Sequence, residues 1–281
     1  MLDRIYIDNI IKTALAEDIN YIDVTTDNLI DDDHESVAYL VAKDSGVLCG
    51  IDIAARVFDF LGGKLKKEIF LKDGSRVKSG DVIANFKGST KTLLKGERTA
   101  LNILQHMSGI ATATRECVKL TKGTNAVITD TRKTLPGLRA LQKYAVTVGG
   151  GRNHRFNLSD GAMLKDNHID AYGSITAAVN ALRKKCGHMC KAEVEVRNFD
   201  ELNEALECGC EIIMLDNMTP DDMALAVKLT NRRAKLEASG NITLANIREV
   251  ALTGVDIISL GALTHSVKCF DISMRIKSSE V

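Results

Sequence analysis

Apolar residues follow one pattern in the first 125 residues of the chain and another pattern after them. Residues 5–15 carry apolar side chains at helical spacing, which predicts an amphipathic helix at the start. Between residues 36 and 87, short apolar runs alternate with Gly-containing turns, a pattern typical of a small strand-rich α+β region. Helical spacing returns over residues 91–122, so we expect helices to link this region to the rest of the chain.

From residue 126 onward, short β-like runs alternate with helical stretches. The β-like runs span residues 126–129, 162–165, 192–196, 211–215, 234–237 and 256–260. The helix candidates between them span residues 136–148, 175–186, 200–207, 220–231 and 244–252. Repeated β/α units indicate a parallel sheet, either a barrel or a doubly wound sheet. A barrel is favoured, although six units fall short of the eight in a complete barrel.

Charge and cysteine content narrow the possible partners and the compartment. The 37 basic and 37 acidic side chains cancel, so no overall field attracts nucleic acid or an anionic membrane. No apolar run reaches the ~18 residues of a membrane-spanning helix, and the N-terminus lacks the order of a signal peptide. Seven cysteines without a C-x-x-C pair fit reduced thiols better than disulfides. We therefore predict a cytoplasmic protein.

The segment that contains Cys186, His188 and Cys190 is interpreted as a helix end rather than a metal site, because no distant ligand pair accompanies it.

Basic side chains concentrate in three motifs between residues 130 and 168. They are Arg132, Lys133, Arg152, His154, Arg155, Lys165 and His168. In a protein without net charge, this local concentration predicts a small polyanion as the ligand. Arginine binds carboxylate or phosphate through two parallel hydrogen bonds, whereas lysine acts as a point charge, so the mixture suits a substrate that carries both groups. A solvated basic face is the alternative interpretation.

Acidic and Gly-containing segments mark the later strand ends. Glu195 and Asp216 follow successive strand candidates, where two carboxylates can share Mg²⁺ and hold a pyrophosphate-bearing substrate. Glu193 points to the same face as Glu195, so alternation alone leaves the choice between them open. Residues 239–241 and 260–262 occupy the position where barrels often bind phosphate, although each segment is equally compatible with a simple turn.

Several common chemistries lack their sequence signatures. The chain has no nucleophile elbow, Walker loop or dinucleotide fingerprint, which disfavours covalent hydrolysis and hydride transfer. Aromatic residues make up only 4% of the chain and do not alternate with basic ones, which disfavours nucleic acid as a partner. Lys165 at a strand end leaves one different chemistry open, the Schiff base of an aldolase-like barrel.

At this level of detail the motifs resemble those of quinolinate phosphoribosyltransferases. The resemblance is carried by Asp-Thr-Arg-Lys-Thr-Leu-Pro-Gly-Leu-Arg at 130–139, Lys-Tyr-Ala-Val at 143–146, Gly-Gly-Gly-Arg-Asn-His-Arg at 149–155 and Leu-Lys-Asp-Asn-His-Ile at 164–169. It continues through residues 96–102, 193–196, 214–217, 237–240 and 258–261. The match therefore covers nearly the whole chain in order.

The resemblance implies a fold, a reaction and an assembly. The fold is of the α/β class, with an N-terminal α/β sandwich domain over residues 1–112, to which the chain end 268–281 returns. A C-terminal open α/β barrel with parallel strands, similar to a TIM barrel, follows over residues 113–267. The reaction transfers phosphoribosyl from phosphoribosyl pyrophosphate (PRPP) to quinolinate with decarboxylation. The assembly is a homodimer or a multiple of dimers, in which Arg98 completes the neighbouring subunit's site.

The resemblance also implies a role for each site residue. The two quinolinate carboxylates are held by Arg132, His154, Arg155 and Lys165, and Thr131 also contacts substrate. PRPP and its Mg²⁺ are bound by Lys133, Glu195 and Asp216, which selects Glu195 over Glu193. The 5′-phosphate lies against Ser239, Gly240 and Asn241 and against Leu260, Gly261 and Ala262. Lys133, Lys165, Glu195 and Asp216 form the catalytic group, and no organic cofactor is expected. Leu135 and Asn241 depart from the residues most frequent in the family, and Asn241 is expected to adjust the phosphate loop.

Three alternatives stay open at this point. One is a protein of the same fold that is associated with molybdate transport genes, although such relatives tend to lack the intact 153–155 and 165–168 motifs. The second is the aldolase-like enzyme that uses Lys165. The third is a catalytically silent sensor of phosphoribosyl metabolites, which the full set of magnesium and substrate ligands disfavours.

Overall fold

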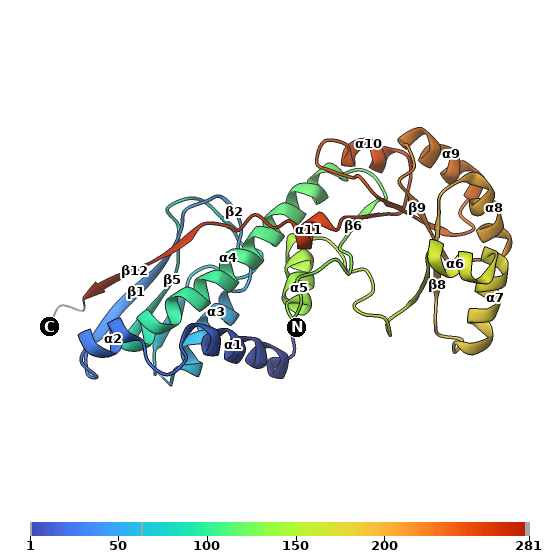
Figure 1. The fold of residues 1–281 in the computed structure, drawn as a ribbon. Helices are drawn as coiled ribbons and strands as arrows, with labels where there is room; N and C mark the ends of the chain where they lie inside the picture. Colours follow the sequence, from blue (N-terminus) through green and yellow to red (C-terminus); the bar gives the residue numbers. More distant parts are fainter. Residues whose placement is uncertain (1, 63, 279–281) are drawn as a thin grey trace. The chain divides into compact units, whose positions relative to one another are not determined.

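The computed structural model describes residues 2–62 and 64–278, and the chain forms two compact units (Figure 1). Unit 1 contains the described residues of 1–115, 135–150 and 264–281. Unit 2 contains residues 116–134 and 151–263. Three separate segments of the chain therefore form unit 1 and two form unit 2, and each unit is described by itself below.

Unit 1 is built on a four-stranded antiparallel sheet. Its strand order is β12 (Ile272–Ser278), β1 (Glu35–Ala42), β5 (Val82–Ser89) and β3 (Lys66–Ile69). Side chains of β1 alternate between buried and more exposed positions, as expected for a sheet with one face on a core. A second, short pair joins β2 (Gly46–Val47) to β4 (Arg76–Val77). The strand-rich region predicted from residues 36–87 is confirmed.

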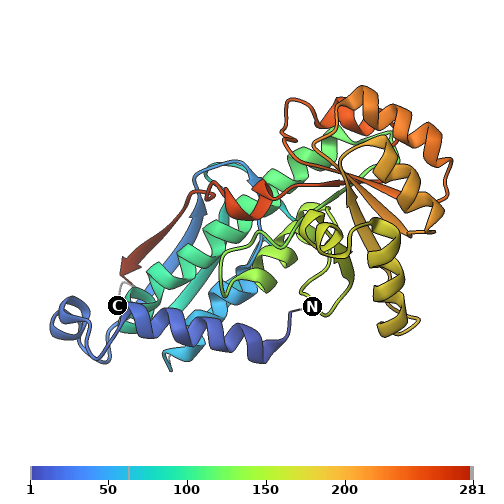
Figure 2. The ribbon, with the colours of Figure 1, turned by 45° about the vertical axis from the view of Figure 1, so that its right-hand side comes forward.

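Helices accompany this sheet. They are α1 (Arg4–Asp18), α2 (Val24–Leu29), α3 (Ile51–Phe60) and α4 (Thr90–Leu120). The carboxylate of Asp3 accepts hydrogen bonds from the N–H groups of Ile5 and Tyr6 at 2.8 and 3.2 Å, which fixes the start of α1. In Figures 1 and 2, α4 runs alongside strands β1, β5 and β12.

The C-terminal segment contacts α4 through hydrogen bonds that involve its own backbone groups. The N–H of Phe270 donates to the carbonyl of Gln105 at 3.0 Å, and the side chain of Gln105 donates to the carbonyl of Ile272 at 2.7 Å. A Cβ on Gly109 would lie only 2.2 Å from the carbonyl oxygen of Lys268, so a glycine is required where the two segments approach. The return of the chain end thus places β12 at the edge of the unit 1 sheet.

Helix α5 (Arg139–Gly149) also belongs to unit 1, which the predicted boundary at residue 113 did not anticipate. The side chain of Gln142 donates to the carbonyl of Thr264 at 2.8 Å, and the hydroxyl of Tyr144 donates to Asp73 at 2.9 Å. Helical spacing predicts that a segment forms a helix, but it does not say which core that helix covers.

Unit 2 is built on a six-stranded parallel sheet. Its strand order is β6 (Val127–Thr129), β11 (Ile257–Ser259), β10 (Lys235–Ser239), β9 (Ile212–Asp216), β8 (Ala192–Val196) and β7 (Ala162–Leu164). All six strands were predicted. Arg152 forms an isolated parallel bridge to Thr129, so the segment after α5 lies beside β6.

Helices lie on the outside of this sheet (Figure 2). They are α6 (Asp166–Tyr172), α7 (Ile175–Lys185), α8 (Phe199–Glu207), α9 (Pro220–Thr230) and α10 (Ile247–Leu252), and α11 (Ala262–His265) follows β11. Helix α6 was not predicted, because its seven residues are too few to show a helical apolar pattern. Its start is fixed by the Lys165 N–H, which donates to Nδ1 of His168 at 3.0 Å.

Candidate active site

A cavity of about 520 Å³ opens in unit 2 where the parallel strands end. The predicted site residues that line it are Thr131, Arg132, Lys133, His154, Arg155, Lys165, Glu195, Asp216 and Ser239. Carboxyl ends of parallel strands meet at one edge of a sheet, which is why residues up to 108 positions apart in the chain share one wall. We refer to this space as the strand-end cavity.

Two arginines face the strand-end cavity without an acidic partner. Neither Arg132 nor Arg155 forms an ion pair within the described residues, and Nε of Arg132 is buried without a hydrogen-bond partner. The guanidinium of Arg155 donates to the carbonyl of Gly161 at 3.0 Å. Burial, followed by the charge of Arg132, lowers the pKa of Arg155 from its ordinary value. Two neighbouring cations that repel each other in a cavity are stabilised when an anion binds between them.

The carboxylates of Glu195 and Asp216 also line this cavity. Oε2 of Glu195 accepts from Nζ of Lys165 at 2.9 Å, and the side-chain exposures are 13% for Glu195 and 47% for Lys165. Asp216 accepts from the side chain of Asn217 at 2.8 Å. The cavity therefore presents cations and carboxylates to the same guest, an arrangement suited to a polyanion that brings a divalent metal.

The loop after β10 is fixed tightly against Asn217. The side chain of Asn241 donates to Oδ1 of Asn217 at 3.0 Å. Gly240 has a φ of +90°, and a Cβ there would lie 2.1 Å from the same oxygen, so no other residue fits without a shift. Gly240 and Asn241, together with Leu260, Gly261 and Ala262, were predicted as phosphate ligands and border the cavity rather than line it.

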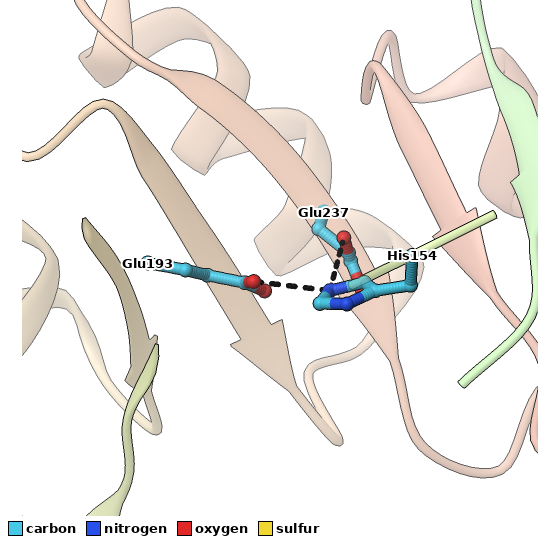
Figure 3. A group of neighbouring side chains, drawn as sticks. All are labelled: His154, Glu193 and Glu237. Atoms are coloured by element: carbon cyan, nitrogen blue, oxygen red, sulfur yellow. Dashed lines mark ion pairs between the residues drawn. The ribbon is translucent and has the colours of Figure 1, made fainter. Parts of the chain in front are cut away.

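His154 lies between two glutamates inside the barrel (Figure 3). Its Nε2 is 3.0 Å from Oε2 of Glu193 and 3.5 Å from Oε2 of Glu237. Burial lowers the pKa of His154, whereas the hydrogen bonds and charges of the two glutamates raise it. Burial also raises the pKa of Glu193, with His154 opposing that shift. Nε2 of His154 therefore faces the carboxylates of both glutamates.

Sequence reasoning missed five lining residues. They are Met163, Met214, Asn217, Glu237 and Ser259. A signal for three of them was present, because Met163, Met214 and Glu237 each lie two positions before a predicted site residue, on the same face of a strand. Arg98 lies exposed on α4 in unit 1, and the structure of one chain does not test its predicted role across a dimer.

A parallel α/β barrel whose strand ends combine unpaired arginines, lysines and two carboxylates defines an enzyme of the phosphoribosyl-transferring class. Family models give the finer assignment. The C-terminal domain of quinolinate phosphoribosyl transferase matches residues 110–275, and the N-terminal domain matches residues 23–108. The chain belongs to the quinolinate phosphoribosyl transferase family.

Individual relatives agree over almost the full length. A Bacillus subtilis (strain 168) protein named probable nicotinate-nucleotide pyrophosphorylase (carboxylating) is 44% identical over 99% of this chain and 96% of its own. A Mycobacterium leprae nicotinate-nucleotide pyrophosphorylase (carboxylating) is 43% identical over 95% of both chains. The crystal structure of NadC from Streptococcus pyogenes is 41% identical, covers 100% of this chain and 99% of its own, and has a TM-score of 0.96. The predicted N-terminal domain and C-terminal barrel are thus confirmed.

Proposed function

We propose that this protein transfers phosphoribosyl from PRPP to quinolinate with loss of carbon dioxide, giving nicotinate mononucleotide and pyrophosphate in de novo NAD biosynthesis. The proposal rests on Arg132 and Arg155, two arginines without an acidic partner. They line the same cavity as the carboxylates of Glu195 and Asp216. Quinolinate brings two carboxylates for the cations, and PRPP brings phosphates and a divalent metal. The relatives' shared name supports the same reaction.

The chain's basic side chains bind and orient the dicarboxylate. Arg132, Arg155 and Lys165 line one cavity and lie within reach of a small dianion. Arginine forks fix the plane of a carboxylate, and Lys165 adds charge, so the pyridine nitrogen is held toward the sugar. His154 lines the same cavity, and we propose that it contacts a carboxylate of the substrate as well.

The phosphoribosyl group is held by the other part of the lining. Ser239 and the loop at Gly240 and Asn241 suit a phosphate, because bare backbone at a tight turn lets an anion approach N–H groups. Thr131 accepts a hydrogen bond from the N–H of Lys133 at 3.0 Å, which places Lys133 at the cavity wall for the pyrophosphate. The segment 260–262 follows β11 at the same sheet edge and completes the proposed phosphate site.

Glu195 and Asp216 fit Mg²⁺, because both offer carboxylate oxygens to one cavity, and oxygen ligands are those that magnesium prefers. When bound together with PRPP, magnesium would neutralise charge on the departing pyrophosphate. No organic cofactor is part of the proposal.

The reaction then proceeds without a protein nucleophile. The pyridine nitrogen of quinolinate forms a bond to the anomeric carbon as the bond to pyrophosphate breaks, through a transition state with oxocarbenium character. The bond between C2 and its carboxylate then breaks and carbon dioxide departs, while the electron pair stays on C2, where the adjacent positively charged nitrogen stabilises it. A proton then replaces it at C2. The residues contribute by positioning and by charge stabilisation, with Lys133 and Lys165 as candidates for the proton donor.

A homodimer, or a multiple of dimers, is the second part of the proposal. A groove of about 710 Å³ in unit 1 lies among α1, α4 and α5, and Ile10, Ile103, Met107 and Leu141 are among its apolar lining; we call it the unit 1 groove. An apolar groove that is open to solvent is typical of an interface. Arg98 is exposed on α4, four residues before Asn102, which lines the groove, so both residues lie on the same face of the helix and a partner that covers the groove would receive Arg98 as well.

Subunit complementation tests this assembly. Arg98→Ala and Lys133→Ala variants, each inactive alone, are mixed, unfolded and refolded together. If Arg98 serves the partner's site, hybrid dimers contain one intact site and activity returns; if Arg98 serves its own subunit, mixing restores nothing. Light scattering on the same samples reports whether dimers form.

A cytoplasmic location is proposed from the thiols. All seven cysteines are free in the structure, and Cys49 and Cys117 are buried, where burial raises their thiol pKa. The described residues contain no helix of the length and apolar character that a bilayer crossing requires. Labelling with a maleimide after denaturation of protein taken directly from cells would count seven reactive thiols if the proposal holds.

The aldolase-like alternative fits the geometry less well. Nζ of Lys165 donates to Glu195 at 2.9 Å, whereas a Schiff-base lysine must present its nitrogen to the carbonyl of a substrate. Borohydride treatment with a carbonyl substrate would trap Lys165 if this alternative were correct.

Production of labelled carbon dioxide and nicotinate mononucleotide from carboxyl-labelled quinolinate tests the proposed reaction. Both products are expected only when PRPP and magnesium are present together. If neither product appears in the complete mixture, the proposed substrate is wrong, and the molybdate-associated and sensor interpretations take its place.

A further inference from the structure

The barrel interior holds two glutamates and one histidine in direct contact (Figure 3). Glu193 projects from β8 and Glu237 from β10, and β9 lies between these two strands in the sheet. The side-chain exposures are 6% for Glu193, 1% for Glu237 and 13% for His154. We call these three residues the interior triad. A second cavity, of about 280 Å³, contacts all three on its other side.

The hydrogen bonds fix which nitrogen of His154 carries a proton. The backbone N–H of Arg155 donates to Nδ1 of His154 at 2.8 Å, so Nδ1 acts as an acceptor. Nε2 must then carry the proton, which it donates to Glu193 at 3.0 Å. A metal ion would need the lone pair of Nε2, and this arrangement does not offer it. The interior triad is therefore a hydrogen-bonded unit and not a metal site.

Burial of the interior triad in the barrel costs free energy. Oε1 of Glu193 and Oε1 of Glu237 are both buried without a hydrogen-bond partner among the described residues. Removing carboxylates from water costs free energy that one imidazole does not fully offset, and well-packed apolar residues of similar size would serve stability at least as well. A cost of this kind points to a role other than stability.

The hydrogen bonds of His154 indicate what this role is. Its own N–H donates to Oδ1 of the buried Asp130 at 3.0 Å, and its Nδ1 receives the N–H of Arg155. The backbone N–H groups of His154 and Arg155 are thus bound to Asp130, directly after β6, and to the imidazole. The guanidinium of Arg155 extends from this anchored backbone into the strand-end cavity.

We infer that Glu193 and Glu237 are positioning residues that hold the ring of His154, which in turn fixes the backbone at Arg155 and aims its guanidinium at the dicarboxylate substrate. His154 belongs to the same positioning unit, because both of its ring nitrogens contact protein atoms. The inference rests on the proposed function for the identity of the substrate, but not for the anchoring of Arg155.

Substitution of Glu193 tests the inference, because it should affect the KM for quinolinate and the KM for PRPP to different extents. Glu193→Leu removes the acceptor at nearly constant volume and should raise the KM for quinolinate about tenfold or more, because a small misplacement of a binding group is costly. The KM for PRPP should change less than about twofold, since Arg155 does not face it. Leu202→Ala, on α8 outside the cavity, is the matched control for loss of buried contacts and should leave both KM values unchanged.

Conservative replacement separates positioning from charge. In Glu193→Gln/Glu237→Gln, the amide oxygens can still accept from Nε2, so the KM for quinolinate should stay within about threefold of wild type. If the glutamine pair raises this KM as much as leucine does, the carboxylate charges act directly and the inference is wrong. It is also wrong if Glu193→Leu leaves the KM for quinolinate unchanged.

Amide hydrogen exchange at Arg155 gives a readout that needs no activity. The wild-type amide is protected by Nδ1 of His154, and Glu193→Leu should speed its exchange about tenfold or more, whereas Leu202→Ala should not. A wild-type enzyme that does not turn over quinolinate would refute the proposed function alone. Equal exchange in wild type and Glu193→Leu would refute the anchoring alone. If Glu193→Leu does not fold, the glutamine pair and its exchange rate decide the question.

Discussion

The strand-end cavity of unit 2 and the unit 1 groove are hollows of similar size with opposite chemistry. The cavity presents Arg132 and Arg155 without acidic partners, beside the carboxylates of Glu195 and Asp216. The groove presents apolar side chains such as Ile103 and Leu141, together with polar ones such as Asn102. Cations that the protein leaves unpaired are stabilised by an anionic guest, whereas apolar surface left open is stabilised by another apolar surface.

This difference favours two different occupants for the two surfaces. In the proposed function, a small polyanion fills the strand-end cavity, and a second copy of the chain covers the unit 1 groove. Substitutions in the cavity should therefore change kinetics without changing assembly. Substitutions in the groove should change assembly first and kinetics only as a consequence.

Lys133→Ala should have the largest effect. Loss of one preorganised charge at the leaving group is expected to lower kcat about 10²- to 10³-fold. Because Lys133 is exposed, the free energy of unfolding should change by less than about 0.5 kcal/mol. Steady-state kinetics and urea unfolding measure the two quantities, and Lys184→Ala on the surface of α7 is the control. Full activity of Lys133→Ala would remove it from the catalytic group.

Arg132→Lys keeps the charge but loses the two-pronged hydrogen bond. Since a hydrogen bond to a charged group contributes about 1.5–3 kcal/mol, the KM for quinolinate should rise about 10- to 100-fold. The KM for PRPP should be nearly unchanged. The opposite result, a rise confined to PRPP, would assign Arg132 to the phosphates instead.

Ile103→Glu places a charge in the unit 1 groove. If a second copy covers this surface, burial of an unpaired carboxylate should weaken dimerisation by about 2 kcal/mol, or about 30-fold in Kd. Sedimentation at several concentrations measures the shift, and activity should fall in parallel. Leu29→Glu, at an exposed position of α2 outside the groove, is the control. Unchanged sedimentation of Ile103→Glu would place the interface elsewhere.

Gly240→Ala should have the smallest effect on kinetics. The added Cβ meets Asn217 and should raise the KM for PRPP about tenfold, while the strained φ costs about 1–3 kcal/mol of stability. Gly123→Ala is a matched control, because Gly123 has a similar φ of +81° but nothing within 4 Å. Equal KM values for the two variants would show that the loop at Gly240 does not contact PRPP.

Much of the barrel could be predicted from the sequence, because strand position follows from local pattern. All six strand candidates lie where the structure has strands, and Glu195 and Asp216 share a wall because parallel strands end at one edge. Helix α6 was missed because its start depends on the side chain of His168 rather than on apolar spacing. Helix α5 was predicted, but its place in unit 1 depends on contacts such as Tyr144 with Asp73, which pair residues 71 positions apart.

The interior triad shows a further limit of prediction from the sequence. The sequence gives no sign that Glu193 and Glu237, on strands separated by a third, contact one imidazole. Alternation does place Glu193 on the face of Glu195 and Glu237 on the face of Ser239, so both could have been assigned to the barrel interior. Their pairing with His154 depends on the depth of each residue in the barrel, which local pattern does not encode.

The central claim is that the strand-end cavity is built for two carboxylates on one ring. It is tested most directly by comparing quinolinate with nicotinate, which lacks the 2-carboxylate, as the acceptor in PRPP-dependent formation of nicotinate mononucleotide. A site that binds a group through buried charged hydrogen bonds rejects an analogue without it by about 10⁴-fold in kcat/KM, and we expect a preference of this order for quinolinate. Comparable kcat/KM values for the two acids would contradict the account, because the unpaired arginines would then not be recognising a dicarboxylate.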